Sequence, residues 1–391
     1  MKYYIIGGGI IGSTIALGIR LRDLGEVVVL EKENKLGEHA SGRNSGVIHS
    51  GINQKPGTLK AKMCVKGSRM LREYCITHRV PMQECGTLVV ARNEEEIKTL
   101  ETLLEMGKAN GVPELRIIGE GELEIREPNI KGVTALYSPN GAIVDAKALN
   151  ESVAKEAQKL GVKYLKNCKV EKINGNKIIT NEGEFLADHI VNCAGLYADK
   201  IAHMMNIGLD YSIIPFRGDY IEVDTKINSM IYQIPDLRYP FLGVHFTKTI
   251  EGKVLGGPNA ALSWKGRESY DGEFSWKEIY EILTSRNFWN LIASKEFLKL
   301  AYKNAKISLS KKSFIDELNS FLENKITKND VKPYRSGIRA QVVSQDGKMI
   351  DDFLIKTTAG STHILNAVSP GLTCSLAFAE FVVDGYIEKL K

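Results

Sequence analysis

Apolar and polar residues follow one another near the start of the chain in the order typical of a βαβ unit. An apolar run at residues 3–6 leads into three consecutive glycines, then an amphipathic stretch at 13–25 and a second apolar run at 26–31. Short apolar runs bounded by turn residues predict buried strands, and apolar residues spaced about 3.6 apart predict a helix. The first 31 residues are therefore predicted to form strand, glycine turn, helix and strand.

Two later parts of the chain carry the same kind of pattern. The pattern predicts a helix at 146–160 and strands at 162–173, 177–180 and 190–193. A strand, a Ser-Pro-Gly-Leu-Thr loop and an amphipathic helix follow near the C-terminal end. Parallel strands joined by helices build a doubly wound sheet. We therefore predict one discontinuous, Rossmann-type α/β domain from residues 1–75, 141–210 and 335–391.

The intervening segments are organised differently. Residues 76–140 are predicted to hold a strand at 86–92 and a helix at 94–111. Residues 211–334 begin with strand-like runs at 211–223, 241–249 and 253–262, and have helical periodicity from Trp276 to about Lys325. We interpret both segments as insertions that form an α+β substrate domain, with a mixed or antiparallel sheet and a helical cap.

Composition and charge limit the class of protein. The 391 residues, 43% hydrophobic and 25% charged, are typical of a globular chain of about two or three domains and exclude a disordered or coiled-coil protein. The net charge of +5 is dispersed, so we expect no nucleic-acid binding, although a weak positive field would favour an anionic substrate or membrane surface. The six cysteines lack metal-type spacing, so we expect no metal site and a reducing, cytoplasmic location. Without a secretory signal or a membrane-spanning run, any membrane contact is expected to be peripheral, at the inner face of the cell membrane.

The glycines of the first turn match a dinucleotide-binding fingerprint. Gly7, Gly9 and Gly12 fit GxGxxG, and Glu31 ends the next strand nineteen residues later. The first glycine permits the tight turn, the second lets the backbone approach a pyrophosphate, and the third allows helix and sheet to pack closely. A carboxylate at the strand end would accept hydrogen bonds from ribose hydroxyls and repel a 2′-phosphate, which disfavours NADP. The alternative is a structural turn followed by an exposed glutamate.

The segment HASGRNSGVIHSG at 39–51 distinguishes FAD from NAD, which share the fingerprint. Such a stretch is not the next helix of an NAD-type domain, and it suits a loop laid along the pyrophosphate and up to an isoalloxazine ring. Groups for phosphates and flavin carbonyls are offered by Ser41, Arg43, Asn44 and Ser45, and Gly46 permits close approach to a flat ring. A solvated polar loop is the alternative.

The remaining cofactor residues are expected at turns that follow predicted strands. The N-terminus of the C-terminal helix, aimed at the flavin pyrimidine edge, would stabilise the negative charge of the reduced ring. A plain strand-to-helix connection is the alternative. The whole expected set is Gly7, Gly9, Gly12, Glu31, Lys32, Ser41, Arg43, Asn44, Ser45, Gly46, Val47, Val170, Ala194, Gly195, Gly371, Leu372 and Thr373.

Two histidines and two arginines are candidates for the chemistry. A flavin enzyme that oxidises a small acid needs a cation for the carboxylate and a base for the hydroxyl or amine proton. Most histidines are surface or core residues, but His49 lies in the polar loop and His245 in a predicted strand of the substrate domain. Arg217 and Arg339 stand in apolar or glycine-rich strands, where a guanidinium needs an anionic partner. Two arginines suit a dicarboxylate, and an internal salt bridge between Arg217 and Asp219 is the alternative.

Seven segments, taken in order, carry a family resemblance. GRNSGVIHSGI, LKAKMCVKGS, VNCAGLYAD, PFRGDY, PFLGVHFT, GGPNA and GIRAQ closely resemble the L-2-hydroxyglutarate dehydrogenase/oxidase family of the FAD-dependent, D-amino-acid oxidase-like superfamily. The resemblance covers nearly the whole chain and is specific in the His49 segment, at 241–247 and at 337–341. Arg43 replaces a histidine of a close family version, and SPGLT differs from a more alanine-rich version; both departures bear on the electron acceptor more than on the substrate.

The resemblance implies a D-amino-acid oxidase-like fold, non-covalent FAD, and oxidation of L-2-hydroxyglutarate to 2-oxoglutarate with electrons passed to a quinone or to oxygen. We hypothesise that the two arginines anchor the two carboxylates, that one histidine takes the hydroxyl proton, and that hydride passes to flavin N5. The expected catalytic set is His49, His245, Arg339, Arg217, Tyr220 and Asn259. The alternatives are an oxidase or dehydrogenase of an α-amino acid, an N-methyl amino acid or glycerol 3-phosphate, and a non-enzymatic flavin-binding protein.

Overall fold

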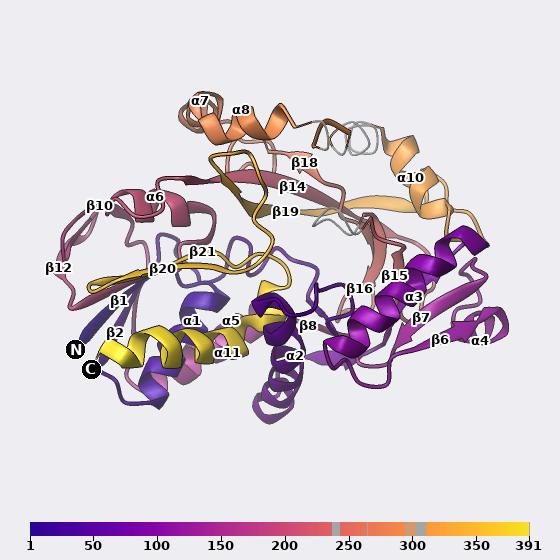
Figure 1. Ribbon diagram of the computed structural model, residues 1–391, viewed down its shortest axis with the longest axis horizontal. Coiled ribbons are helices and arrows are strands. Elements are labelled where there is room, and N and C mark those ends of the chain that lie inside the picture. The colour runs from indigo at the N-terminus through magenta and orange to yellow at the C-terminus, as the bar shows by residue number, and fades with distance from the viewer. Residues whose placement is uncertain (237–242, 264, 295–296, 300, 302–309, 391) are drawn as a thin grey trace.

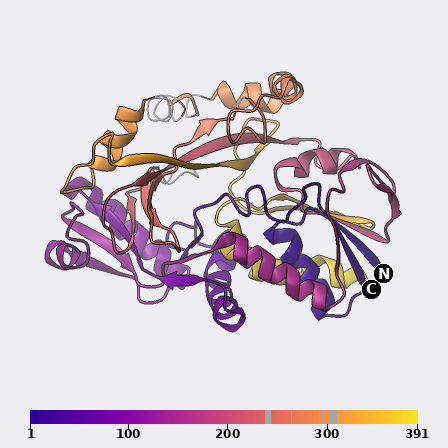
Figure 2. The ribbon, with the colours of Figure 1, turned by 180° about the vertical axis from the view of Figure 1, so that it is seen from behind.

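Two large β-sheets, each covered by helices, make up most of the protein (Figure 1). The computed structural model describes residues 1–236, 243–263, 265–294, 297–299, 301 and 310–390. The N- and C-terminal ends lie close together beside the starts of the first strands of the first sheet, as both views show (Figure 2). None of the helices in these ranges is long and apolar enough to cross a membrane.

The first sheet has six strands in the order β20-β21-β13-β1-β2-β9. Its strands are β1 (Lys2–Ile6), β2 (Glu26–Leu30), β9 (Lys163–Leu165), β13 (His189–Asn192), β20 (Leu354–Thr358) and β21 (Ser361–Asn366). All neighbours pair in parallel except β20 and β21, which form an antiparallel hairpin at one edge. The central strands come from three distant parts of the chain, so the sheet is assembled from discontinuous segments.

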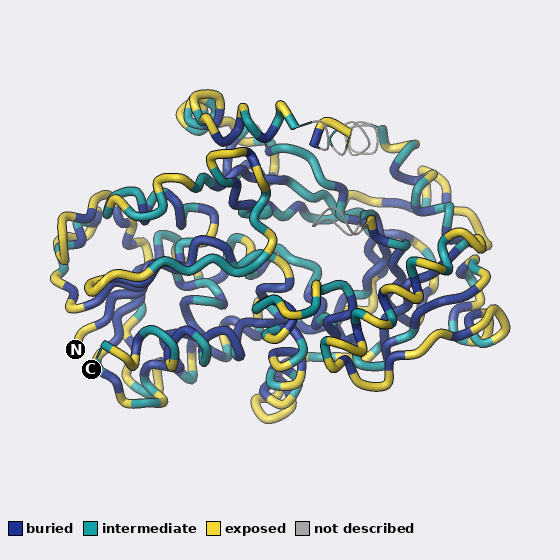
Figure 3. The backbone as a smooth tube through the Cα atoms, viewed as in Figure 1, coloured by how far each residue is buried: buried dark blue, intermediate teal, exposed yellow. Residues whose placement is uncertain are grey.

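Alternate residues of β1 and β2 serve the two faces of this sheet, because successive side chains of a strand point to opposite sides. Tyr3 and Ile5 join a core with helices α1 (Ile10–Leu21), α2 (Leu59–His78), α5 (Ala146–Lys159) and α11 (Gly371–Val382). Tyr4 and Ile6 join a second core with β10 (Val170–Asn174), β11 (Lys177–Thr180) and α6 (Ala198–His203). Burial on both faces explains why these strands are apolar throughout, and the buried backbone is visible along them in Figure 3.

The second large sheet has nine strands and is mostly antiparallel. Its longest pair is β14 (Tyr211–Val223) with β19 (Val331–Ser344). The other strands are β5 (Thr87–Ala91), β6 (Arg116–Gly119), β7 (Thr134–Ser138), β15 (Met230–Gln233), β16 (His245–Lys248), β17 (Val254–Gly257) and β18 (Ala261–Leu262).

Helices cover both faces of the second sheet. Helix α3 (Glu94–Ala109) packs on the side of Val89, and α10 (Lys311–Asn319) packs on the side of Leu88 and Val90. Helices α7 (Trp276–Thr284) and α8 (Arg286–Ile292) lie over β14 and β19 at the upper edge of Figure 1. The remaining elements are α4 (Glu120–Arg126), the short strands β3 (Val47–Ile48), β4 (Met82–Glu84), β8 (Ala142–Val144) and β12 (Gly183–Leu186), and the single turns η1 (Gly195–Tyr197), η2 (Val383–Ile387) and η3 (Glu388–Leu390).

The mixed α/β architecture agrees with the prediction, but several elements differ. The strand predicted at 162–173 is two strands in different sheets, β9 and β10, because the chain turns at Asn167, whose φ is 56°. The motif segment at 59–78 forms the long helix α2, which was not predicted. The helix predicted from Trp276 to Lys325 is divided into α7, α8 and α10, and residues 295–296, 300 and 302–309 of that range lie outside the described residues, as do residues 241–242 of the strand predicted at 241–249.

The division into two discontinuous domains stays a prediction. Strand β19 runs through the predicted boundary at residue 335 and pairs with β14 along its length. If the domains are defined by the sheet to which each segment belongs, residues 335–344 fall in the domain of the second sheet rather than the first.

Buried histidines predict that the protein loses stability in mild acid. His189 bonds Thr362 at 2.9 Å and His363 bonds Ser361 at 2.9 Å inside the first sheet, and burial lowers the pKa of each to about 4. The unfolded chain, with histidine pKa values near 6.5, binds more protons than the native protein between about pH 6.5 and 4, so the stability present above pH 6.5 falls as the pH decreases. We expect urea unfolding between pH 7 and 5 to lose about 1 kcal/mol per pH unit for each such histidine. His363→Gln should reduce this slope; equal slopes for the variant and the unmodified protein would contradict the assignment.

Candidate active site

A cavity of about 340 Å³ is lined by residues of both large sheets. Its walls come from the N-terminus of α1, the polar loop at 39–49, strands β14, β16 and β19, and the loop that leads into α11. The expected residues that line it are Gly9, Ser41, Arg43, Asn44, Ser45, Val47, His49, Gly195, Arg217, Tyr220, His245, Asn259, Arg339, Gly371, Leu372 and Thr373. The structure thus brings all six candidate catalytic residues and most candidate cofactor residues to one cavity.

The glycine turn has room for no side chain. A Cβ on Gly12 would lie 2.0 Å from the carbonyl oxygen of Gly7, and a Cβ on Gly7 would lie 2.4 Å from that of Cys193. Behind the turn, the Glu31 carboxylate accepts hydrogen bonds from the backbone N–H groups of Gly8 at 2.8 Å and Glu33 at 2.9 Å. The turn thus presents bare backbone to the cavity at the start of α1, which fits a dinucleotide pyrophosphate.

The other expected cofactor residues lie outside the cavity wall. Lys32 forms ion pairs with Glu33 and Glu268, and Val170 and Ala194 belong to the apolar core beside the first sheet. Gly46 packs against the backbone of β8, where a Cβ would lie 2.4 Å from the oxygen of Val144. These residues remain candidates for the parts of FAD that extend beyond the cavity.

Replacing Gly12 with alanine should abolish cofactor retention, because the added Cβ meets backbone rather than a movable side chain. We expect FAD affinity to fall at least about tenfold, which corresponds to ~1.4 kcal/mol. The ratio of flavin to protein absorbance after purification measures it. Gly121→Ala is the matched control, because a Cβ at Gly121 in α4 has nothing within 4 Å. A Gly12→Ala protein with normal flavin content would contradict the assignment of the turn.

The polar loop is held by bonds that the sequence pattern did not indicate. Ser41 accepts a hydrogen bond from the N–H of Ile10 at 2.9 Å, which ties the loop to the start of α1. The Asn44 amide bonds the loop backbone itself, donating to Ser41 at 2.7 Å. Arg335 of β19 donates to the carbonyl oxygens of Gly42 at 3.0 Å and Asn44 at 2.9 Å. Arg335, absent from the predicted set, therefore joins the second sheet to the cofactor loop.

Two neighbours fix the orientation of the His245 ring. Its Nδ1 lies 2.8 Å from the carbonyl oxygen of Gly243, and its ring stacks on Tyr232 with centroids 4.3 Å apart. A carbonyl oxygen only accepts, so Nδ1 carries the hydrogen and Nε2 is left as a proton acceptor. Burial lowers the pKa of His245 to about 4, which keeps the ring neutral at physiological pH.

His49 is the second candidate base and faces the same cavity. Burial, and then the nearby His245, lower the pKa of His49 to about 4. Its backbone N–H donates to the hydroxyl of Thr373 at 3.0 Å, which links the polar loop to α11. Among the described residues no side-chain hydrogen bond fixes the His49 ring, in contrast to His245.

Arg339 is fixed from one side by a glutamine of its own strand. Its Nε donates to the side-chain oxygen of Gln341 at 3.1 Å, and that amide in turn donates to the carbonyl oxygens of Val342 and Ile350. Gln341 is fully buried, so it fixes the guanidinium from behind. Burial lowers the pKa of Arg339 to about 10, so the side chain stays charged at neutral pH.

Arg217 lies on the neighbouring strand and is engaged by groups of the protein. Its Nε donates to the Asp219 carboxylate at 2.7 Å and its Nη1 to the carbonyl oxygen of Ser269 at 2.8 Å. The side-chain oxygen of Asn259 accepts a hydrogen bond from the backbone N–H of Asp219 at 2.7 Å, so Asn259 holds the backbone of β14 beside Arg217. The salt bridge considered as an alternative is thus present, although Arg217 still lines the cavity.

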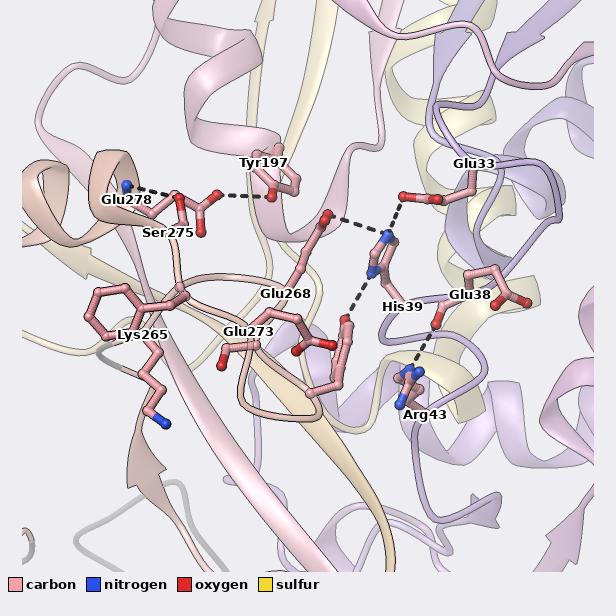
Figure 4. A pocket seen from close by; sticks show the side chains of 14 residues that line it. Glu33, Glu38, His39, Arg43, Tyr197, Lys265, Glu268, Glu273, Ser275 and Glu278 are labelled. Atoms are coloured by element: carbon pink, nitrogen blue, oxygen red, sulfur yellow. Dashed lines mark hydrogen bonds and ion pairs between the residues drawn. The ribbon is translucent and has the colours of Figure 1, made fainter.

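A second pocket of about 460 Å³ adjoins the first and shares Arg43 with it (Figure 4). The Arg43 guanidinium lies over the ring of Tyr270, 4.0 Å from its centroid, and donates to the carbonyl oxygen of Glu38. His39 joins the Tyr270 hydroxyl at 2.9 Å to the Glu33 carboxylate at 3.0 Å. Arg43 therefore lies between the two pockets, and Tyr270 holds its guanidinium on the side of the second pocket.

The chain belongs to the FAD dependent oxidoreductase family, whose model matches residues 2–384. It is 39% identical over 396 residues to the L-2-hydroxyglutarate dehydrogenase of Indibacter alkaliphilus, with 98% of each chain covered. It is 36% identical to the protein of that name from Escherichia coli K12, covering 98% of this chain and 92% of the relative, and 36% identical to the human mitochondrial one, covering 97% and 87%. These relatives agree with the resemblance carried by the sequence motifs.

Solved structures confirm the D-amino-acid oxidase-like fold. L-alpha-glycerophosphate oxidase from Mycoplasma pneumoniae with FAD bound has a TM-score of 0.74 at 24% identity, with 98% of this chain and 94% of that chain covered. Glycine oxidase from Geobacillus kaustophilus has a TM-score of 0.73 at 16% identity, with 100% and 95% covered. The protein is thus an FAD-dependent oxidoreductase, and these two likenesses bear on its fold alone.

Proposed function

We propose that this protein binds FAD non-covalently and oxidises L-2-hydroxyglutarate to 2-oxoglutarate, passing electrons to a quinone or to oxygen. The observation that carries the proposal is one cavity that holds two arginines on paired strands and an oriented, neutral histidine beside the glycine turn. The names of the relatives support the choice of substrate. A bound FAD supplies the acceptor for the hydride of the substrate α carbon.

In this proposal the two arginines bind the substrate carboxylates and one histidine accepts the hydroxyl proton. Arg339, fixed by Gln341, holds one carboxylate by paired hydrogen bonds. Arg217 faces the other carboxylate while Asp219 orients its guanidinium. His245 accepts the hydroxyl proton at Nε2, with Nδ1 held by Gly243, and His49 is the alternative base. Tyr220 borders the same cavity, where burial raises the pKa of its hydroxyl to about 12, so it acts as a neutral hydrogen-bond donor.

Anaerobic bleaching of the flavin absorbance tests the substrate directly. We expect L-2-hydroxyglutarate to bleach the flavin at low concentration, and D-2-hydroxyglutarate, L-lactate, glycine, sarcosine and glycerol 3-phosphate to do so slowly or not at all. Faster bleaching by another member of the panel would overturn the substrate assignment. Stopped-flow reoxidation of the reduced enzyme, by oxygen and by a soluble quinone, then identifies the electron acceptor.

A monocarboxylate substrate is the second candidate, favoured by one observation. The Nε of Arg217 donates to the Asp219 carboxylate at 2.7 Å, so the charge of Arg217 is already balanced in part by a group of the protein. An α-hydroxy or α-amino acid with a single carboxylate would need only Arg339. The two candidates differ in the effect of Arg217→Ala, which should raise KM strongly for a dicarboxylate and little for a monocarboxylate.

A further inference from the structure

The motif LKAKMCVKGS at 59–68 forms the start of α2, yet it contributes none of the described residues that line the cavity of about 340 Å³. Lys60 is its unusual member, because the side chain is only 5% exposed. Lysine is almost never fully buried unless it is paired, so a buried ammonium indicates a specific partner. The partners of Lys60 connect this motif with Arg339.

Two neighbouring aspartates hold the start of α2. The Lys60 ammonium donates to the Asp351 carboxylate at 2.9 Å. The Asp352 carboxylate accepts hydrogen bonds from the backbone N–H groups of Leu59 at 3.0 Å and Lys60 at 2.8 Å, which have no partner within the helix itself. Asp352 therefore binds the helix backbone, and Asp351 is the carboxylate that meets the Lys60 side chain.

The loop that carries both aspartates is tied to Arg339. The side-chain oxygen of Gln341 accepts from Arg339 Nε at 3.1 Å, and its amide donates to the carbonyl oxygen of Ile350 at 2.9 Å. Asn366 donates to the carbonyl oxygens of Ile350 at 3.1 Å and Asp352 at 2.7 Å. Both amide side chains are buried, so these bonds fix the backbone on either side of the first aspartate.

Asp351 acts on two cations at once. Burial lowers the pKa of Lys60, while the Asp351 charge opposes this effect and the Arg339 charge adds to it. Burial also lowers the pKa of Arg339 to about 10, and the Asp351 charge again opposes the effect. The three groups are therefore close enough to influence one another's ionisation, and the ion pair at 2.9 Å joins Asp351 to Lys60.

We propose that Lys60 is a positioning residue of the substrate site, which engages the Asp351 carboxylate and so prevents it from competing with substrate for the Arg339 guanidinium. The inference rests on the proposed function, in which Arg339 binds a carboxylate. A carboxylate of the protein that pairs with an arginine takes up donors that substrate would use, as Asp219 takes up the Nε of Arg217. Lys60 offers Asp351 a charge-assisted hydrogen bond in place of such a pair.

A purely structural ion pair is the alternative, and the unequal exposure of the two partners disfavours it. The Asp351 side chain is 61% exposed, whereas that of Lys60 is 5% exposed. An ion pair with a solvated member contributes little to stability, and removal of the ammonium from water is unfavourable. An apolar side chain of similar length would fill the space at position 60 without that desolvation, so stability alone does not explain a lysine there.

Titration of the FAD-loaded enzyme with glutarate tests the proposal without turnover, because glutarate has two carboxylates but no α-hydroxyl group. Perturbation of the flavin absorbance measures its Kd. We expect Lys60→Met to weaken binding at least about tenfold, because the released Asp351 pairs with Arg339. Asp351→Asn should tighten binding by up to about threefold, because it removes a negative charge. The double variant Lys60→Met, Asp351→Asn should recover the Kd of the unmodified enzyme to within about threefold.

Lys62→Met is the matched control, because it makes the same change at an exposed position of the same helix and should leave the Kd unchanged. With L-2-hydroxyglutarate, the KM values of the variants should follow the same order as the Kd values, whereas kcat should change by less than about threefold. Binding of glutarate in the expected order without oxidation of L-2-hydroxyglutarate would support the role of Lys60 and contradict the proposed substrate.

Three results would overturn the role of Lys60. The first is a lower melting temperature for Lys60→Met with an unaltered Kd of the folded protein, as a structural ion pair predicts. The second is a double variant that binds as weakly as Lys60→Met, since no competing carboxylate remains in it. The third is weaker binding by Asp351→Asn, which decides the matter even if Lys60→Met does not fold. Failure of the unmodified enzyme to bind glutarate would contradict the carboxylate site at Arg339, and the role of Lys60 with it.

Discussion

Arg339→Ala is expected to lower kcat/KM for L-2-hydroxyglutarate by about a hundredfold or more, which corresponds to ~3 kcal/mol. Most of the effect should appear as a raised KM, because the guanidinium binds the same carboxylate in the ground state and the transition state. The loss is large because the cavity encloses the charge pair, with Gln341 fixing one side of the guanidinium.

The control for Arg339 is Arg69→Ala, which removes an exposed arginine of α2 and should leave the kinetics unchanged. Arg339→Lys keeps the positive charge but removes the planar fork, so it should recover only part of the lost affinity. Steady-state kinetics of the three variants with normal flavin content decide the matter. Unaltered KM and kcat for Arg339→Ala would exclude Arg339 from substrate binding.

His245→Gln should lower kcat by about 10²- to 10⁴-fold, the range typical of a lost general base. The base must be unprotonated, and its pKa of about 4 predicts that kcat/KM rises with pH through about 4 and is level above about 5. This limb lies well below the usual histidine pKa of about 6.5, because burial disfavours the charged ring.

His49→Gln is the paired variant, because burial gives His49 the same pKa of about 4 but the described structure supplies no side-chain bond that orients its ring. We expect it to retain the acidic limb, whereas His245→Gln should lose it. The reverse result would identify His49 as the base. Retention of the limb and of normal rates by both variants would mean that the proton leaves by another route.

The sequence contained the elements of the nucleotide site because they depend on local pattern. Gly7, Gly9, Gly12 and Glu31 lie within 25 residues, and the uninterrupted apolar runs of β1 and β2 indicate burial on both faces. Sixteen of the residues expected to bind cofactor or substrate line one cavity, although they are spread along the chain from residue 9 to residue 373.

What could not be predicted depends on strand register and on side-chain orientation. Arg335 bonds a loop that lies almost 300 residues earlier in the chain, and Gln341 acts on Arg339 only because both are on the cavity side of β19. The segment 59–78 has weak helical amphipathicity because the buried stripe of α2 includes the polar or small residues Lys60, Gly67 and Ser68, so the sequence shows no clear apolar stripe. Glu278 and Glu281 of α7 bond Tyr197 and Lys200, which lie about 80 residues earlier in the chain, and periodicity does not reveal such partners.

The order of the strands in the first sheet has a consequence for synthesis on the ribosome. The glycine turn after β1 emerges early, yet β1 is flanked by β13 from the middle of the chain, and β13 in turn by β21 from residues near the end. Helix α11, whose first turn lines the cavity, follows β21. The nascent chain therefore cannot complete its cofactor site until α11 has been synthesised, so capture of FAD must follow synthesis of β1, β13 and β21.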